Sequence, residues 1–382
     1  MADNKDKKVL NAPHLRFPEF SGEWVETTLG KISEITKGSG ISKDQLSEQG
    51  SPCILYGELY TKYKSEIIDE VYSRTELDSS SLVKSKANDV IIPCSGETAI
   101  DISTARCVPF NNILLGGDLN IIRLKHDDGG FFAYQLNGAR KKDIARVAQG
   151  VSVVHLYGEN LKQIRVYHPN IEEQKKITRL LSLIDERIAT QNKIIEKYKS
   201  LIKGLRVCCM QRVYGNNVHL SEIAQIYQPQ TISSTELTED GFLVYGANGI
   251  IGKYKDYNHE TEQICITCRG NTCGMVNYTK PMSWITGNAM VINTDKYQDK
   301  VYKRYLYHYL SAYNFNSIIS GSGQPQIVRT PLEKLKITLP TISEQKQKAM
   351  ILDKIQNKID TNHKELNLYV RQKQYLLRQM FI

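Results

Sequence analysis

Apolar residues recur at steps of four and three from Ile177 onward, a pattern that predicts one long helix from Asn170 to Gln211. The stripe has the heptad periodicity of a coiled coil, with a single polar interruption. Its members are Ile177, Leu181, Ile184, Ile188, Gln191, Ile195, Tyr198, Ile202 and Leu205. Pro169, followed by Asn170-x-x-Glu173, matches a capping box at the start of the helix. The stretch is therefore predicted to form one uninterrupted coiled-coil helix.

A second copy of this pattern closes the chain. Thr341-x-x-Glu344 repeats the cap 171 residues further on, again just after a proline. The equivalent stripe contains Leu352, Ile355, Ile359, Asn362, Leu366, Tyr369 and Leu376. The polar break recurs, since Asn362 matches Gln191, and so does the aromatic residue, since Tyr369 matches Tyr198. Shared exceptions indicate duplication more strongly than shared periodicity does.

The segments before the two helices also repeat each other in order. The matched pairs are Leu29–Ile35 with Leu220–Ile226, Leu55–Gly57 with Val244–Gly246, Cys94–Thr98 with Cys268–Thr272, Gly150–Leu156 with Gly321–Ile327, and Leu161–Ile164 with Leu332–Leu335. Five matches in one order are not expected by chance. Strand-like runs at Asp89–Pro93 and Leu119–Leu124, with a helical candidate at Gly130–Asn137, indicate mixed secondary structure within these segments.

We therefore predict a mixed α/β (α+β) protein with two similar globular domains separated by two long helices. The expected parts are a leader (1–21), a first domain (22–168), a first helix (169–212), a second domain (213–340) and a second helix (341–382). Full-length pairing of the helices requires an antiparallel intramolecular coiled coil with a pseudo-two-fold axis. Roughly forty residues give a rod on the order of 60 Å. We expect Gln191 and Asn362 to approach each other and fix its register, at some cost in stability.

Composition sets broad limits on function. The chain has 382 residues and a formal net charge of +9, which suits a polyanion partner but is also common in proteins that bind none. It contains no run of about 18 apolar residues and no secretory signal. Eight cysteines without such a signal favour reduced thiols in the cytoplasm.

Motifs that would carry chemistry fail on inspection. Gly246–Lys253 resembles a P-loop, but five residues separate its outer glycines and Tyr254 occupies the magnesium-binding position, which favours a glycine-rich turn or hairpin. Cys265, Cys268 and Cys273 lack a convincing fourth ligand, so buried thiols are favoured over zinc. We find no methyltransferase motif or nuclease cluster, and we expect no catalytic residue, metal or cofactor. The sequence favours a protein that binds and arranges other molecules.

Polar and basic residues are the better candidates for function. The cations of Arg140–Arg146 have near-helical spacing, which suits a phosphate-binding face or an ordinary solvated face. Gln324 and Gln326 have amide edges that can read adenine or phosphate, or they can stabilise a turn. Lys303 and Arg304 precede a tyrosine-rich run that suits a basic-aromatic surface or a packed helix, of which the packed helix is favoured. The candidate DNA contacts are Arg106, Arg140, Lys141, Lys142, Arg146, Arg269, Lys303, Arg304, Gln324 and Gln326.

The tandem halves resemble the specificity subunit of bacterial type I restriction–modification systems. The resemblance covers essentially the whole chain and includes the Pro-x-x-x-Glu-Gln-Lys helix entries (Pro169–Lys175 and Pro340–Lys346), the Gly-Ser-Gly-Gln-Pro-Gln-Ile loop (321–327) and the Gly22-Glu-Trp24 opening. It implies two target recognition domains, each reading one half of a bipartite double-stranded DNA target. It also implies that the helices are a spacer docking two modification subunits, which restriction subunits join.

The same resemblance implies that methyl transfer from S-adenosylmethionine and ATP-driven cleavage belong to those partners. The first loop, Gly150–Leu156, lacks the Gln-Pro-Gln of the second, so identical contacts by the two loops are not expected. One alternative is a related system whose partner joins methylation and cleavage in one polypeptide. Another is a scaffold or regulator that uses its coiled coil for protein contacts, and an enzyme is the least supported reading.

Overall fold

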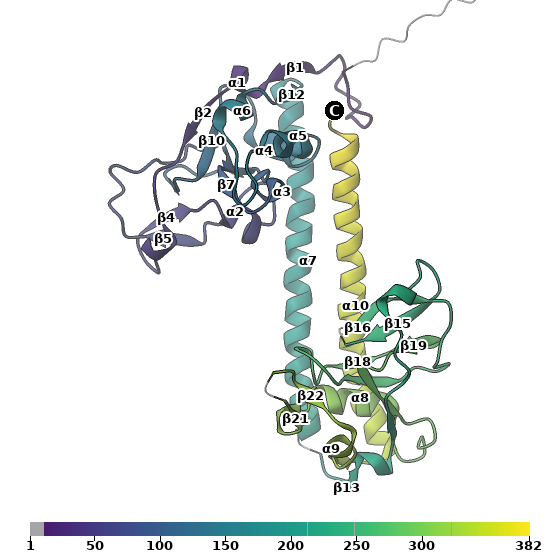
Figure 1. Cartoon of the computed structure of the whole chain (residues 1–382). Coiled ribbons are helices and arrows are strands. Elements are labelled where there is room, and N and C mark those ends of the chain that lie inside the picture. The colour runs from purple at the N-terminus through teal and green to yellow at the C-terminus, as the bar shows by residue number, and fades with distance from the viewer. Residues whose placement is uncertain (1–10, 212, 248, 322) are drawn as a thin grey trace, which may run out of the picture. The chain divides into compact units, whose positions relative to one another are not determined.

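The computed structural model describes residues 11–211, 213–247, 249–321 and 323–382. It divides into two compact units, of which unit 1 comprises residues 1–192 and 365–382, and unit 2 comprises residues 193–364. Two long helices, α7 (Ile171–Gln211) and α10 (Ile342–Gln379), each contribute one half to each unit (Figure 1). Both predicted helices are confirmed. Residues 1–10 of the predicted leader and residue 212 lie outside the described residues.

Unit 1 is built around a four-stranded antiparallel sheet with the order β2-β10-β6-β8. A second sheet has the order β3-β5-β4-β9, and β1 pairs with β12 and β7 with β11. The strands are β1 Val25–Thr28, β2 Ser33–Lys37, β3 Leu46–Ser47, β4 Ser51–Ile54, β5 Ser73–Thr75, β6 Asp89–Pro93, β7 Ser95–Gly96, β8 Arg106–Val108, β9 Leu114–Leu115, β10 Leu119–Leu124, β11 Val154–His155 and β12 Arg165–His168. The helices are α1 Leu29–Ile32, α2 Glu58–Thr61, α3 Ala99–Ile102, α4 Gly129–Asn137, α5 Lys141–Val147 and α6 Gly158–Lys162, with a 3₁₀ turn at Lys43–Gln45.

The central sheet of unit 1 is buried on both faces. Successive side chains of a strand point to opposite faces, so Val90 and Ile92 pack in one apolar cluster with helix α4, while Ile91 packs in another. Burial on both faces explains why β6 reads as a continuous apolar run. The predicted strands Asp89–Pro93 and Leu119–Leu124 are confirmed with the same bounds, and the predicted helix near Gly130–Asn137 is α4.

Unit 2 repeats this plan. Its sheets have the orders β14-β20-β17-β18 and β16-β15-β19, and β13 pairs with β23 and β21 with β22. The strands are β13 Asn216–His219, β14 Gln225–Tyr227, β15 Phe242–Gly246, β16 Gly249–Tyr254, β17 Ile264–Thr267, β18 Val276–Tyr278, β19 Ser283–Ile285, β20 Ala289–Asn293, β21 Ile319–Ser320, β22 Gln326–Ile327 and β23 Lys336–Leu339. The shorter helices are α8 Lys303–Ala312 and α9 Arg329–Glu333, with 3₁₀ turns at Leu220–Glu222, Ser234–Glu236 and Phe315–Ser317.

The two units share details of strand pairing as well as strand order. In unit 1, β4 pairs in parallel with β9, and in unit 2, β15 pairs in parallel with β19. Within β17, Ile264 and Ile266 pack in the cluster that contains α8, whereas Cys265 faces the opposite cluster. The matched sequence segments therefore fold into matched structures, as the repeat predicted.

The halves of α7 and α10 pack antiparallel within each unit. In unit 1, Asp185 of α7 lies 2.6 Å from Lys373 of α10, and Gln191 donates a hydrogen bond of 3.0 Å to Glu365. In unit 2, Lys348 of α10 donates to the carbonyl of Cys209 near the end of α7, at 3.2 Å. The stripe residues that are buried are Ile177, Leu181, Ile184, Gln191, Ile195, Ile202, Leu352, Ile359 and Leu376. The predicted approach of Gln191 to Asn362 stays a prediction.

A glutamine ties each long helix to the domain beside it. Gln174 accepts a hydrogen bond from the backbone of Asp128, at the cap of α4, and donates to the carbonyl of Pro169, both at 2.9 Å. Gln345 accepts from Tyr302, at the cap of α8, at 2.8 Å, and donates to Pro340 at 3.0 Å. These contacts give a structural reason for the glutamine in both Glu-Gln-Lys entries.

The core of unit 1 is completed by residues from both ends of the described chain. The ring of Phe381 lies 6.3 Å from that of Trp24 and 5.2 Å from that of Phe131. Arg16 forms an ion pair of 2.7 Å with Glu173. Residues 11–20 thus lie against the start of α7. Among the described residues, no helix is both long and apolar enough to cross a membrane.

Candidate nucleic-acid interface

Three of the repeated stretches meet at one exposed edge of unit 2, the described residues of Val244–Ile251, Cys268–Thr272 and Gly321–Ile327, which we call the motif edge of unit 2. The Ile327 amide donates to the carbonyl of Cys268, and the Gly270 amide donates to Pro325, both at 3.0 Å. The Thr272 hydroxyl donates to the carbonyl of Ala247 at 3.2 Å. Stretches far apart in sequence therefore form one surface.

The equivalent stretches of unit 1, Leu55–Gly57, Cys94–Thr98 and Gly150–Leu156, form the motif edge of unit 1. The Leu156 amide donates to the carbonyl of Cys94, and the Cys94 amide donates to Asp118, both at 2.7 Å. A cavity of about 430 Å³ opens here, lined by Ile41, Ser42, Gln45, Leu55, Tyr56 and Asp118 together with Gly40, Gly116 and Gly117. Both units therefore gather their repeated motifs at one place.

The two edge loops share a backbone but differ in side chains. Gly150 has φ of +120° and Gly321 has φ of +91°, and a Cβ at either position would clash with a carbonyl three residues on. The loop of unit 1 exposes apolar groups, since 96% of Val151 and 53% of Val153 are accessible. The loop of unit 2 exposes Gln324 instead. A common scaffold thus carries different contact groups in the two units.

Three of the predicted contacts come together in unit 2. Arg269 forms a β-bridge with Gln326, so their side chains stand opposite each other on one face, with Cβ atoms about 4.5–5.5 Å apart. Gln324 lies two residues before Gln326, and all three residues are exposed. Arginine and glutamine are the side chains that bind the major-groove edges of guanine and adenine in bidentate fashion.

The basic run of Arg140–Arg146 divides between surface and interior. Lys142 and Arg146 of α5 are exposed, and Arg146 pairs with Asp143 at 3.0 Å. The Arg140 guanidinium lies 5.1 Å from the centre of the Tyr167 ring. Burial lowers the pKa of Lys141, which donates to Thr104 at 3.3 Å. Lys142 and Arg146 are therefore the members of the run whose side chains are exposed enough to meet phosphate.

Each of the remaining predicted cations forms polar contacts inside its own unit. Arg106 is 7% exposed and donates to the carbonyls of Leu59 at 3.0 Å and Tyr63 at 2.9 Å, and burial lowers the pKa of its guanidinium. Lys303 pairs with Asp295 at 2.6 Å, and Arg304 pairs with Asp353. We therefore leave Arg106, Lys303 and Arg304 out of the proposed contacts, because their charges are used inside the fold.

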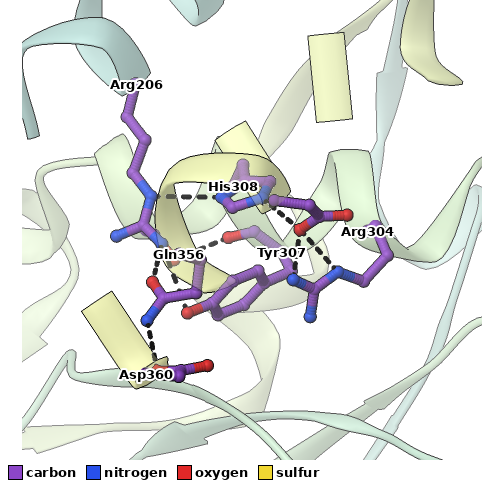
Figure 2. A network of polar contacts seen from close by, with 8 residues as sticks. Arg206, Arg304, Tyr307, His308, Gln356 and Asp360 are labelled. Atoms are coloured by element: carbon purple, nitrogen blue, oxygen red, sulfur yellow. Dashed lines mark hydrogen bonds and ion pairs between the residues drawn. The ribbon is translucent and has the colours of Figure 1, made fainter. Parts of the chain in front are cut away.

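The tyrosine-rich run after Lys303 forms helix α8, in agreement with the favoured prediction that it packs. A polar network joins this helix to both long helices in unit 2 (Figure 2). Arg206 of α7 donates through Nε to Nδ1 of His308 at 3.1 Å. Nε2 of His308 lies 2.9 Å from a carboxylate oxygen of Asp353 on α10. Burial lowers the pKa of His308. The network positions the second domain on its helices and does not reach the motif edge.

The segments that mimic catalytic or metal motifs have structural roles. The described residues of Gly246–Lys253 lie in the hairpin of β15 and β16, which confirms the favoured reading. Cys265 and Cys268 are fully buried, and burial raises the pKa of Cys265 to about 12. In the part of the chain that the structure describes, no three His, Cys, Asp or Glu residues are grouped to hold a metal.

Two features escaped sequence reasoning. Lys373 of α10 is only 13% exposed and bridges Asp185 and Glu66, two carboxylates that are themselves buried. The signal was present, because Lys373 occupies the stripe position equivalent to Ile202 of the first helix. Ile250 at the hairpin tip, within the motif edge of unit 2, is 53% exposed. No periodic pattern marks it, because its exposure depends on the hairpin.

Comparison with known proteins agrees with this architecture. Residues 21–199 and 216–368 each match the type I restriction modification DNA specificity domain. The type I restriction enzyme EcoprrI specificity subunit of Escherichia coli is 32% identical over 147 residues, which are 37% of this chain and 36% of that protein. The alignment thus spans about a third of that relative. The type I restriction enzyme MjaVIII specificity subunit of Methanocaldococcus jannaschii is 23% identical over 418 residues, covering 94% of this chain and 92% of the relative.

Solved structures show the same fold. An S subunit of a type I restriction–modification system from M. genitalium superposes with a TM-score of 0.69 at 19% identity, covering 97% of this chain and 99% of that one. A chain from a study of complex assembly and conformational transition of the type I R-M system has a TM-score of 0.55 at 15% identity, covering 94% of this chain and 97% of that one. Because the family model matches both repeats across most of the chain, this protein belongs to the type I restriction–modification DNA specificity family, as a specificity subunit.

Proposed function

We propose that this chain reads a bipartite double-stranded DNA target, with the motif edge of each unit contacting one half-site. The observation that carries the proposal is the convergence of the repeated motifs on one exposed edge in each unit. In unit 2 this convergence brings Arg269 together with Gln324 and Gln326. Hydrogen bonds from such side chains to base edges discriminate sequence, whereas contacts to the backbone position the protein.

Phosphate contacts supply most of the affinity in this proposal. Lys142 and Arg146 are exposed on α5, and the whole chain has a formal net charge of +9. Each phosphate neutralised by lysine or arginine releases counterions, so binding weakens steeply as salt rises. Removal of one such contact weakens binding to all sequences by a similar factor.

The long helices act as spacer and docking surface. Two modification subunits dock on them and restriction subunits join the complex, while methyl transfer and ATP-driven cleavage take place in those partners. This chain contributes no catalytic residue or cofactor, and the complex works in the cytoplasm. Both helices have exposed apolar side chains that are available to such partners. They are Leu183, Leu201, Val207, Met350, Ile351, Leu368, Val370 and Tyr375.

The proposed functional parts keep the predicted boundaries. Residues 22–168 and 213–340 are the target recognition domains, and the helices in 169–212 and 341–382 set the distance between half-sites. Insertion of whole helical turns into both helices should change the spacer of the target and leave the recognised bases unchanged.

Exchange of one recognition domain tests the proposal. Residues 22–168 would be replaced by the matching domain of another specificity subunit, with 365–382 exchanged as well, because Leu376, Met380 and Phe381 belong to the same core. Genome-wide mapping of methylated positions should then show one altered half-site. Exchange of 213–340 is the matched control and should alter the other half-site. A change in both half-sites, or in neither, would contradict modular reading.

A further inference from the structure

The second recognition domain carries a hairpin that the first domain replaces with a helix. In unit 1, Leu55–Gly57 is followed by α2, whereas in unit 2 the matched Val244–Gly246 turns into the hairpin of β15 and β16. Gly246 stands opposite Gly249, whose φ of +85° allows the chain to reverse tightly. The hairpin is thus a feature by which unit 2 differs from unit 1.

The tip of this hairpin exposes an isoleucine, Ile250. Tyr245 pairs with Ile250 and Val244 with Gly252, so Ile251 is the extra residue of a bulge. A Cβ built on Gly246 would lie 3.0 Å from Cδ1 of Ile251, which shows that Ile251 leans on the hairpin backbone. Ile250 is 53% exposed, against 44% for Ile251. Ile250 is therefore the more exposed of the two isoleucines at this tip.

The hairpin tip adjoins the proposed base readers. The carbonyl of Ala247 accepts hydrogen bonds from the hydroxyls of Thr267 and Thr272, which flank Arg269 on either side. The sequence segments around this surface contain Arg269 and no aspartate or glutamate. They are the described residues of Gly246–Ile251, Cys268–Asn277, Thr286–Asn288 and Gly321–Ile327. A polyanion meets no carboxylate repulsion from these segments, so duplex DNA is the partner that fits them.

We propose that Ile250 reads the C5-methyl group of a thymine in the major groove, beside the bases contacted by Arg269 and Gln326. The major groove admits a two-stranded ribbon, and the thymine methyl is the apolar group on its base edges. Burial of an exposed isoleucine against this methyl removes both from water. The inference rests on the proposed DNA recognition and adds one base preference to the half-site read by unit 2.

Replacement of thymine by uracil tests this contact, because uracil keeps every pairing group and lacks only the methyl. The probe is the mapped target duplex, with each thymine of the unit 2 half-site changed in turn, bound by the full chain with its modification subunits. One replacement should weaken binding about fourfold. Ile250→Ala should weaken binding to the thymine duplex and abolish the difference between thymine and uracil. Ile251→Ala is the matched control and should keep that difference.

The possible results distinguish the role of Ile250 from the proposed DNA recognition on which it rests. Equal binding of every uracil duplex, a uracil effect that persists in Ile250→Ala, or a half-site without an A·T pair would overturn the role of Ile250. Absence of sequence-specific binding by the unaltered complex would instead overturn the proposed function. Thermal melting verifies that Ile250→Ala is folded, and Ile250→Ser provides a second variant in which the same loss of thymine preference is expected.

Discussion

His308 accepts a hydrogen bond from Arg206 through Nδ1, at 3.1 Å, and this contact fixes the tautomer of its ring. Because the guanidinium can only donate, Nδ1 carries no proton. The proton of the neutral ring is then on Nε2, which faces Asp353 at 2.9 Å. If Nδ1 were protonated, its N–H and the N–H of Arg206 would face each other in a buried site, with no acceptor between them. Burial and the charge of Arg206 accordingly lower the pKa of His308, although Asp353 opposes them.

Acid should destabilise unit 2 through this histidine. The pKa of His308 is lowered in the folded state. Below about pH 6.5 this histidine therefore binds a proton in the unfolded chain while it stays neutral in the folded chain. Stability should therefore fall as the pH decreases through this window, by at most about 1.4 kcal/mol per pH unit. His308→Gln should flatten the dependence in urea unfolding curves measured from about pH 7 to 5. His363→Gln, at an exposed position of α10, is the control, and an unchanged slope in His308→Gln would contradict the assignment.

Removal of Lys373, the buried lysine of unit 1, should lower the free energy of unfolding by more than removal of an exposed cation does. Lys373→Met leaves Asp185 and Glu66 without their shared cation, and an unpaired buried charge typically costs about 3 kcal/mol. Arg371→Met, on an exposed position of the same helix, should change stability by less than about 0.5 kcal/mol. When Asp185→Asn and Glu66→Gln are added to Lys373→Met, most of the lost free energy of unfolding should be recovered, as measured by chemical denaturation. Equal losses in the single and triple variants would show that packing, not charge, dominates.

Phe381→Ala should destabilise unit 1 although most of that unit lies much earlier in the sequence. Phe381 is 5% exposed and contacts the rings of Trp24 and Phe131, so truncation should cost about 3–5 kcal/mol. Hydrogen exchange resolved by peptide should locate the loss of protection in unit 1. Tyr375→Ala, on a half-exposed residue of α10 six positions before Phe381, is the control. Loss of protection in unit 2 alone would contradict the assignment of Phe381 to the first core.

Substitution of a base-contacting residue should alter the sequence specificity of binding, whereas substitution of a phosphate-contacting residue should leave the specificity unchanged. Arg269→Ala and Gln326→Ala should each cost about 1–3 kcal/mol and relax the target at one base pair of the unit 2 half-site. Arg146→Ala should weaken binding to all sequences and reduce the steepness of its salt dependence by about one unit. Binding of randomised duplexes at several salt concentrations measures both effects. Uniform loss of affinity in Arg269→Ala would reassign that residue to phosphate.

Regular patterns made the framework predictable from sequence. The stripe around Leu181, the caps at Asn170 and Thr341, and the buried run Asp89–Pro93 all specify structure locally, and the structure contains the corresponding helices and strand. The duplicated motifs revealed two equivalent domains for the same reason. These features depend on neighbours in sequence, where periodicity is informative.

The candidate DNA contacts were less predictable, because the charge of a side chain does not show whether that side chain pairs inside the fold or faces solvent. Arg269 lies within the turn Cys268–Thr272, and Arg106 follows the matched turn Cys94–Thr98. Arg106 is buried against the carbonyls of Leu59 and Tyr63, whereas Arg269 is exposed. The pairing of Arg269 with Gln326 joins distant segments. Burial of Lys373 beside Glu66 likewise depends on where α10 returns to the first domain. Such outcomes are decided by tertiary contacts that no local pattern encodes.

The contact of Phe381 with Trp24 also sets an order of events during synthesis. The core of unit 1 needs Leu376, Met380 and Phe381, whereas the segments of unit 2 are all translated before them. The ribosome adds about 5–20 residues per second, so unit 1 waits on the order of tens of seconds after its own first segment has emerged. During this interval the apolar surface around Trp24 is unprotected. The domain made first is thus completed last, and the nascent chain is most exposed to misassembly and chaperone capture at its earliest part.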